Sequence, residues 1–182
     1  MFRTTREAMD LVLDAAWRSV VYGRRREFVT GNNDADGVTL LHWVRDRFPG
    51  REAHLRAKLA QWGGNRSGVD VANIDNLGNV RSRRFGEIWT DTSDPLMAGL
   101  KQSPRPVKGR CSRCAYFDVC GGNTRVRAWQ VARDAWAEDP GCYLDDDELG
   151  IAPGGERLVA KPYVRLSRAE AAAEFVNVDP RS

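Results

Sequence analysis

Four cysteines constrain the fold of this chain more than any other feature of the sequence. They are the whole cysteine complement of its 182 residues, and they follow the spacing C-x2-C-x5-C-x21-C at Cys111, Cys114, Cys120 and Cys142. Four thiols gathered in this way, with no other cysteine to pair with, have the composition of a complete ligand set for one metal centre. Such a centre forms only if residue 142 returns to the loop that carries the other three.

Two disulfide bonds are the alternative, and they would suit a secreted protein. The chain starts with Met1 followed by Arg3, Arg6 and Glu7, which is not the apolar pattern of a signal segment. No apolar run approaches the length that crosses a bilayer. We therefore expect a soluble, cytoplasmic protein with reduced thiols and no contact with a membrane.

Charge is distributed unevenly along the sequence. The formal net charge of +3 is too small to imply a nucleic-acid partner. Residues 101–133 are nevertheless strongly basic, and residues 134–148 carry only acidic charges. Both runs are consistent with solvated faces, whereas the basic run would also offset the negative charge of a thiolate-rich cluster.

The first 66 residues are predicted to be mostly helical. Apolar spacing and glycine or proline boundaries predict helices over about residues 5–22, 34–48 and 51–62, with a short strand over 27–30. A helix, strand, helix, helix order is typical of the end of an α/β barrel, in which the loop after a strand lies on the active face. Asn32, Asn33 and Asp34 in that loop are therefore candidate substrate contacts, unless they only turn and cap the chain.

The second part of the chain alternates between strand and helix patterns. A period of two predicts a strand over residues 69–75 and a turn over 76–79. A short helical piece from residue 85, a helix over about 95–102 and a helix over about 124–133 surround the cysteine loop. His42 and His54 are the only histidines, and there is no phosphate loop or dinucleotide fingerprint, so hydrolytic chemistry has little support.

The cysteine spacing also bears on the identity of the metal. Structural zinc usually takes two closely spaced pairs of ligands, and this chain has one such pair. An iron–sulfur cube is larger and accepts ligands from a looping backbone, so the spacing favours one [4Fe-4S] cluster while zinc and unliganded thiols stay open. Arg125 and Arg127 follow a ligand closely and would donate to a cluster or to substrate carboxylates, or would simply be solvated.

Two segments of the sequence are specific enough to indicate a family. Residues 108–128 read KGRCSRCAYFDVCGGNTRVRA, and residues 136–144 read WAEDPGCYL. Together they resemble the C-terminal SPASM-type domain of radical SAM enzymes, and within that group the NirJ-like enzymes of heme d1 biosynthesis. The strings FVTGNNDADG at 28–37 and ANIDNLGNV at 72–80 are similar to the same family.

This resemblance implies a two-part enzyme. An N-terminal partial (β/α) barrel would carry a C-x3-C-x2-C motif whose cluster cleaves S-adenosylmethionine to a radical, and the C-terminal domain would carry an auxiliary [4Fe-4S] cluster. The family acts on a siroheme-derived tetrapyrrole on the way to heme d1. Cys111, Cys114, Cys120 and Cys142 match the cysteines that hold the auxiliary cluster.

The resemblance predicts an α+β chain in three parts. Residues 1–66 would be the helical remnant of the barrel, residues 67–150 a small SPASM-like iron–sulfur domain with a short hairpin and helices, and residues 151–182 a loosely structured tail. No cysteine precedes Cys111, so the C-x3-C-x2-C motif is absent and the chain alone is expected to be inactive toward S-adenosylmethionine.

Three hypotheses about function follow. The chain is a C-terminal fragment of a NirJ-like enzyme that needs a separately encoded N-terminal half, unless it is a decayed or mis-started reading frame. It is instead a free-standing iron–sulfur electron-transfer module, with an electron donor that the sequence does not identify. Or it is a zinc-stabilised binding module.

Overall fold

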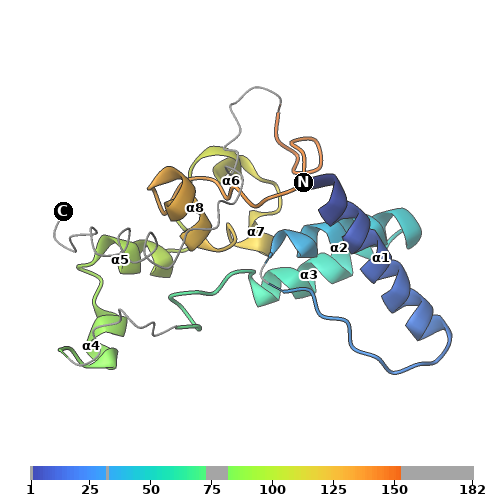
Figure 1. The fold of residues 1–182 in the computed structure, drawn as a ribbon, viewed down its shortest axis with the longest axis horizontal. Helices are drawn as coiled ribbons and strands as arrows, with labels where there is room; N and C mark the ends of the chain where they lie inside the picture. The colour runs from blue at the N-terminus through green and yellow to red at the C-terminus, as the bar shows by residue number, and fades with distance from the viewer. Residues whose placement is uncertain (1, 32, 73–81, 153–182) are drawn as a thin grey trace, which may run out of the picture.

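The computed structural model describes residues 2–31, 33–72 and 82–152. The described residues are mainly helical (Figure 1). The helices are α1 (Phe2–Val21), α2 (Ala35–Arg47), α3 (Glu52–Trp62), α4 (Phe85–Thr90), α5 (Pro95–Lys101), α6 (Gly109–Arg113), α7 (Phe117–Cys120) and α8 (Arg125–Ala132).

Helices α1, α2 and α3 lie together at one end of the molecule, α6, α7 and α8 lie at its centre, and α4 and α5 lie at the other end (Figure 1). Helix α2 packs against α1, α3 and α7, and α3 also packs against α7. The helices of the first 66 residues are therefore in direct contact with the segment that carries the cysteines.

One apolar core joins these two regions. Tyr143 and Leu144 are both 1% exposed, and they pack with the buried side chains of α1 and α2. Arg6 in α1 reinforces this contact, because its guanidinium donates 3.0 Å to the carbonyl of Tyr143 and pairs with Glu148. The core consists of Met9, Leu13, Ala35, Val38, Leu41, Trp43, Val119, Tyr143, Leu144, Leu149 and Ile151.

Several helix ends lie where the sequence predicts them. Helix α3 ends at Gly63, whose φ of 78° lies in the left-handed region that glycine adopts without strain. Helix α5 begins after Asp94, whose carboxylate accepts from the amides of Leu96 at 2.8 Å and Met97 at 2.9 Å. A glycine thus defines the end of α3, and a capping aspartate before Pro95 defines the start of α5.

The predicted strand over residues 27–30 is wrong, because this described segment has no regular secondary structure. A strand needs a neighbour to satisfy its backbone groups, and no described segment pairs with it.

The strand predicted over residues 69–75 is described only up to residue 72, where Ser67 and Val71 form an isolated bridge. Its remainder, the turn over 76–79 and most of the predicted tail lie outside the described residues. The α+β class, the barrel remnant and the SPASM-like domain therefore stay predictions. Within the described ranges, none of the helices has the length and apolar character to span a membrane.

Candidate metal centre

The four cysteines line one cavity. Cys111 lies in α6, Cys114 directly follows it, Cys120 is the last residue of α7, and Cys142 lies in the segment that returns to the core. The cavity has a volume of about 30 Å³, and it is also lined by apolar side chains of α2 and of the 144–149 segment and by the charged residues Arg110, Glu138 and Asp139. The fold thus brings the four predicted ligands to one place, and their binding of a metal stays a prediction.

None of the four cysteines is in a disulfide bond in the described structure, and each is partly buried. Burial raises the pKa of Cys111 to about 11 and also raises the pKa of Cys114 and of Cys120. Thiols in such surroundings stay protonated until a cation replaces their protons. Among the described residues, no group of three or more His, Cys, Asp or Glu side chains is close enough to hold a single ion.

Two backbone amides donate to cysteine sulfurs. The amide of Asp139 lies 3.4 Å from Sγ of Cys111, and the amide of Tyr116 lies 3.4 Å from Sγ of Cys114. Hydrogen bonds to sulfur stabilise its anionic form and are one of the means by which proteins adjust iron–sulfur centres. The backbone around the cavity is therefore already arranged for thiolate ligands.

Arg110 connects the first cysteine to the segment that carries the last. Its side chain is buried, and its Nε donates to Asp146 at 2.6 Å while Nη2 donates to the carbonyl of Leu144 at 2.7 Å. The amide of Arg110 donates to the carboxylate of Glu138 at 2.7 Å. These contacts close the loop of chain between Cys111 and Cys142.

Asn123 connects the loop before α2 to the segments that carry the cysteines. It is 1% exposed and has a φ of 59°, in the left-handed region that Asn tolerates better than most residues. Its Nδ2 donates to Asn33 Oδ1 at 2.6 Å and to Asp139 Oδ2 at 2.9 Å, and its Oδ1 accepts from the amide of Asp34 at 3.3 Å. Asn33 in turn donates to the carbonyl of Gly141, next to Cys142.

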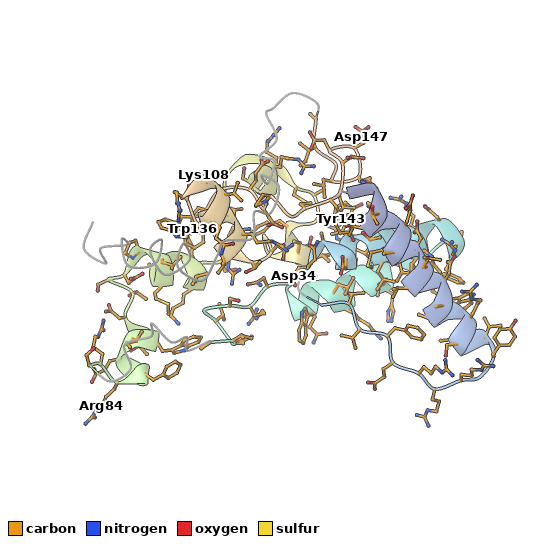
Figure 2. All side chains as sticks on the ribbon, viewed as in Figure 1. Asp34, Arg84, Lys108, Trp136, Tyr143 and Asp147 are labelled. Carbon is orange, nitrogen blue, oxygen red and sulfur yellow. The ribbon has the colours of Figure 1, made fainter. Side chains whose placement is uncertain are left out.

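Of the three predicted substrate contacts, Asn33 and Asp34 line a cleft of about 390 Å³ between α1, α2 and α3. Burial raises the pKa of Asp34, and it raises the pKa of Asp36 on the same cleft. Figure 2 shows Asp34 and Tyr143 at the junction between α1–α3 and the cysteine region, where the Tyr143 hydroxyl donates to Asp36 at 2.8 Å. Asn32 lies outside the described residues.

The glycines after α3 allow the chain to approach α7 closely. Gly64 has a φ of 63°, and a Cβ there would lie 2.3 Å from the carbonyl carbon and oxygen of Cys120. The amide of Asn65 donates to that same carbonyl at 3.2 Å. Only glycine fits against the backbone of this ligand.

The two predicted arginine contacts differ in their surroundings. Arg127 pairs with Asp139 through two bonds, Nε to Oδ1 at 3.0 Å and Nη2 to Oδ2 at 2.8 Å. Arg125 is 5% exposed and donates from Nη1 to the carbonyl of Ala137 at 2.7 Å, while its Nη2 is buried with no hydrogen-bond partner in the described structure. A role of Arg125 or Arg127 toward a substrate stays a prediction.

The buried charged residues near the cavity bear on whether the site fits an anionic group. Of the three buried arginines of this region, Arg110 lines the cavity together with the two buried carboxylates of Glu138 and Asp139, whereas Arg105 and Arg125 lie outside its lining. A buried cation with an unused donor requires an anionic partner, and four thiolates holding iron and sulfide would be one. The residues present therefore fit the predicted cluster.

Sequence reasoning missed Arg110, Asn123, Glu138 and Asp139 as parts of the site. The available signal was the switch from a basic run to an acidic run at residue 134. The two segments meet at the cavity, and their opposite charges form ion pairs there, such as Arg110 with Asp146.

Comparison with known proteins identifies relatives of the chain. It is 48% identical over 176 residues to the pre-heme d1 synthase of Dinoroseobacter shibae, a match that covers 88% of this chain and 43% of the relative. The chain is a homologue of pre-heme d1 synthase. The family resemblance predicted from the sequence is confirmed by this match.

Other relatives of the chain also carry heme-related names. The Fe-coproporphyrin III synthase of Methanosarcina barkeri is 39% identical over 163 residues, which are 80% of this chain and 41% of the relative. The AdoMet-dependent heme synthase of Oleidesulfovibrio alaskensis is 37% identical over 67 residues, which are 37% of this chain and 16% of the relative.

The chain thus spans about two fifths of the length of the first two relatives. No family model matches the sequence. No solved structure matches it either.

Proposed function

We propose that this chain is the auxiliary [4Fe-4S] cluster-binding portion of a NirJ-like radical SAM enzyme of heme biosynthesis. The observation that carries the proposal is that Cys111, Cys114, Cys120 and Cys142 line one cavity, in a chain 48% identical to a pre-heme d1 synthase. The substrate of the intact enzyme would be a tetrapyrrole, and the SPASM-type domain would supply the cluster site.

The geometry supports a cluster over a single zinc ion. Zinc holds four sulfurs about 2.3 Å from one point, whereas an iron–sulfur cube keeps its ligands around a larger body. The four thiols here line one cavity, and no three such side chains of the described residues are close enough to hold a single ion. Two amide-to-sulfur bonds and the buried Arg110 on the cavity wall would stabilise the negative charge of four thiolates.

Two sets of contacts hold the site together. Arg110 and its partners Glu138 and Asp146 hold residue 142 against α6. Asn123 and Gly64 tie the loops of the first 66 residues to α7. When bound, a cluster with four cysteine ligands has no open iron site, so it would transfer electrons or stabilise the fold.

Cleavage of S-adenosylmethionine would belong to a part that carries the C-x3-C-x2-C motif, which this sequence does not contain. We propose that this chain works together with such a part. Mixing a protein that contains such a part with this chain is expected to restore cleavage only when both are present.

The test of the cluster is the iron, sulfide and zinc content of protein purified without oxygen. About four irons and four sulfides per chain are expected. Cys120→Ser should lose most of both, and Ser112→Ala, an exposed change in the same segment, should retain them. Far-UV circular dichroism checks that each variant is folded. One zinc per wild-type chain without sulfide would refute the proposal.

A further inference from the structure

The side chain of Arg125 has one nitrogen that its protein surroundings leave unused. Its Nη1 donates to the carbonyls of Ala137 at 2.7 Å and Ala135 at 3.3 Å, and its Nε donates to the carbonyl of Asn123 at 3.4 Å. Among buried side-chain nitrogen and oxygen atoms of the described residues, Nη2 of Arg125 is the one without a partner. Arg125 is only 5% exposed, so solvent does not replace that partner.

The unused nitrogen lies next to Gly122, a residue of the wall of the cysteine cavity, although Arg125 itself lines a neighbouring cavity between α5 and α8. This nitrogen is 3.6 Å from the position that a Cβ on Gly122 would occupy, and Gly122 lines the cavity with the four cysteines. The charge of Arg125 is also within electrostatic range of Cys111 and Cys120: burial lowers its pKa, and negative charge at either sulfur acts to raise it. The guanidinium is therefore beside the place that an anionic group would fill.

The other buried arginines of this region do not share this feature. Arg105 donates from Nη2 to the carbonyl of Ser67 at 2.6 Å and from Nη1 to Asn65 at 3.2 Å. Arg110 is paired with the carboxylate of Asp146 at 2.6 Å. Within the described residues, neither Arg105 nor Arg125 has a hydrogen bond to a carboxylate, and Arg125 is the one of the two that also has a buried nitrogen without a partner.

We propose that Arg125 is a positioning and charge-compensating residue for the cluster, donating from Nη2 to a sulfur of the bound group and favouring its reduced form. This inference rests on the proposed cluster site. Reduction adds one electron, here from dithionite, to a group that is already anionic. A buried positive charge stabilises the added electron, because little solvent screens the interaction.

Three variants separate this role from a general loss of positive charge. Arg125→Gln removes the charge and keeps an amide donor for the nearby carbonyls. Arg125→Lys keeps the charge and loses the fork of donors. Arg113→Gln removes an equal charge from an exposed side chain located between the ligands Cys111 and Cys114, so it is the matched control.

The experiment is a redox titration of the iron- and sulfide-loaded chain with dithionite, followed by the visible spectrum and electron paramagnetic resonance. Arg125→Gln is expected to lower the ratio of reduced to oxidised cluster at a given potential at least tenfold. For a one-electron couple this is a shift of about 59 mV to more negative potential. Arg125→Lys should shift less, and Arg113→Gln should match the wild type.

The outcomes distinguish the inference from the function on which it rests. Wild-type protein without iron and sulfide would overturn the proposed function. A wild-type cluster whose potential is the same in Arg125→Gln, or moves equally in Arg113→Gln, would overturn only the role of Arg125. If Arg125→Gln no longer holds the cluster, retention by Arg125→Lys supports charge compensation, and loss from both variants overturns it.

Discussion

Replacement of Gly64 by alanine tests the close contact between the loop after α3 and the predicted ligand Cys120. Gly64 has a φ of 63°, and an L-residue in that conformation costs about 1–2 kcal/mol. The new Cβ would also lie 2.3 Å from backbone atoms of Cys120, so the two segments must separate. Separation breaks the hydrogen bond from the amide of Asn65 to Cys120, which is worth about 1 kcal/mol.

The expected loss in the free energy of unfolding is therefore about 2–4 kcal/mol, including residual repulsion. Gly23→Ala is the matched control, because Gly23 has a φ of 65° and a Cβ there would meet no atom within 4 Å. That variant should lose only the conformational cost of about 1–2 kcal/mol.

The assay is urea denaturation without oxygen, followed by tryptophan fluorescence, together with iron content after desalting. Gly64→Ala should be less stable than Gly23→Ala and should retain less iron, since Cys120 is displaced from its place beside the cavity. Equal losses of stability in the two variants, with equal iron, would refute the reasoning that the Gly64 contact positions this ligand.

Two further predictions concern buried and half-buried polar contacts. Asn123→Asp should lower the free energy of unfolding by about 3 kcal/mol or more, because a carboxylate would replace the amide that donates to Asn33 and Asp139; an unchanged thermal midpoint would contradict this. The contact of Glu148 with Arg6 lowers the pKa of Glu148, so its stabilisation is present at neutral pH and lost as the pH falls through that lowered pKa. Glu148→Gln should therefore be less stable by up to about 1 kcal/mol at pH 7, and urea titrations should show the difference shrinking in acid; a difference that is constant down to about pH 3 would count against it.

Most helices were accessible to sequence reasoning because their signals are local, whereas α6 and α7 lie within the segment that was predicted to be a loop. Apolar spacing, the glycines after α3 and the Asp94–Pro95 start of α5 act within a few residues of the element that they define. The strand over residues 27–30 failed for the opposite reason, since a strand depends on a neighbour that local pattern does not supply. The four cysteines were predicted to meet because their number and spacing suit the ligand set of one metal centre.

The contacts around the cavity could not be predicted from local sequence patterns. Asn123 takes a left-handed conformation and contacts Asn33, ninety positions away in sequence. Burial of Arg125 follows from the return of the chain at residues 135–137, where backbone carbonyls accept from its guanidinium. Contacts of this kind depend on the path of the whole backbone, which composition and periodicity do not define.

The shared core has a consequence for dividing this chain into working pieces. Tyr143, which directly follows the predicted ligand Cys142, is buried against α2, where Thr39 lies 2.7 Å from its hydroxyl and Asp36 accepts from it. A protein shortened to begin after residue 66 would leave that aromatic face in water. The cysteine segment therefore does not fold as an independent unit. Grafting it onto another enzyme would require the transfer of α1 and α2 as well.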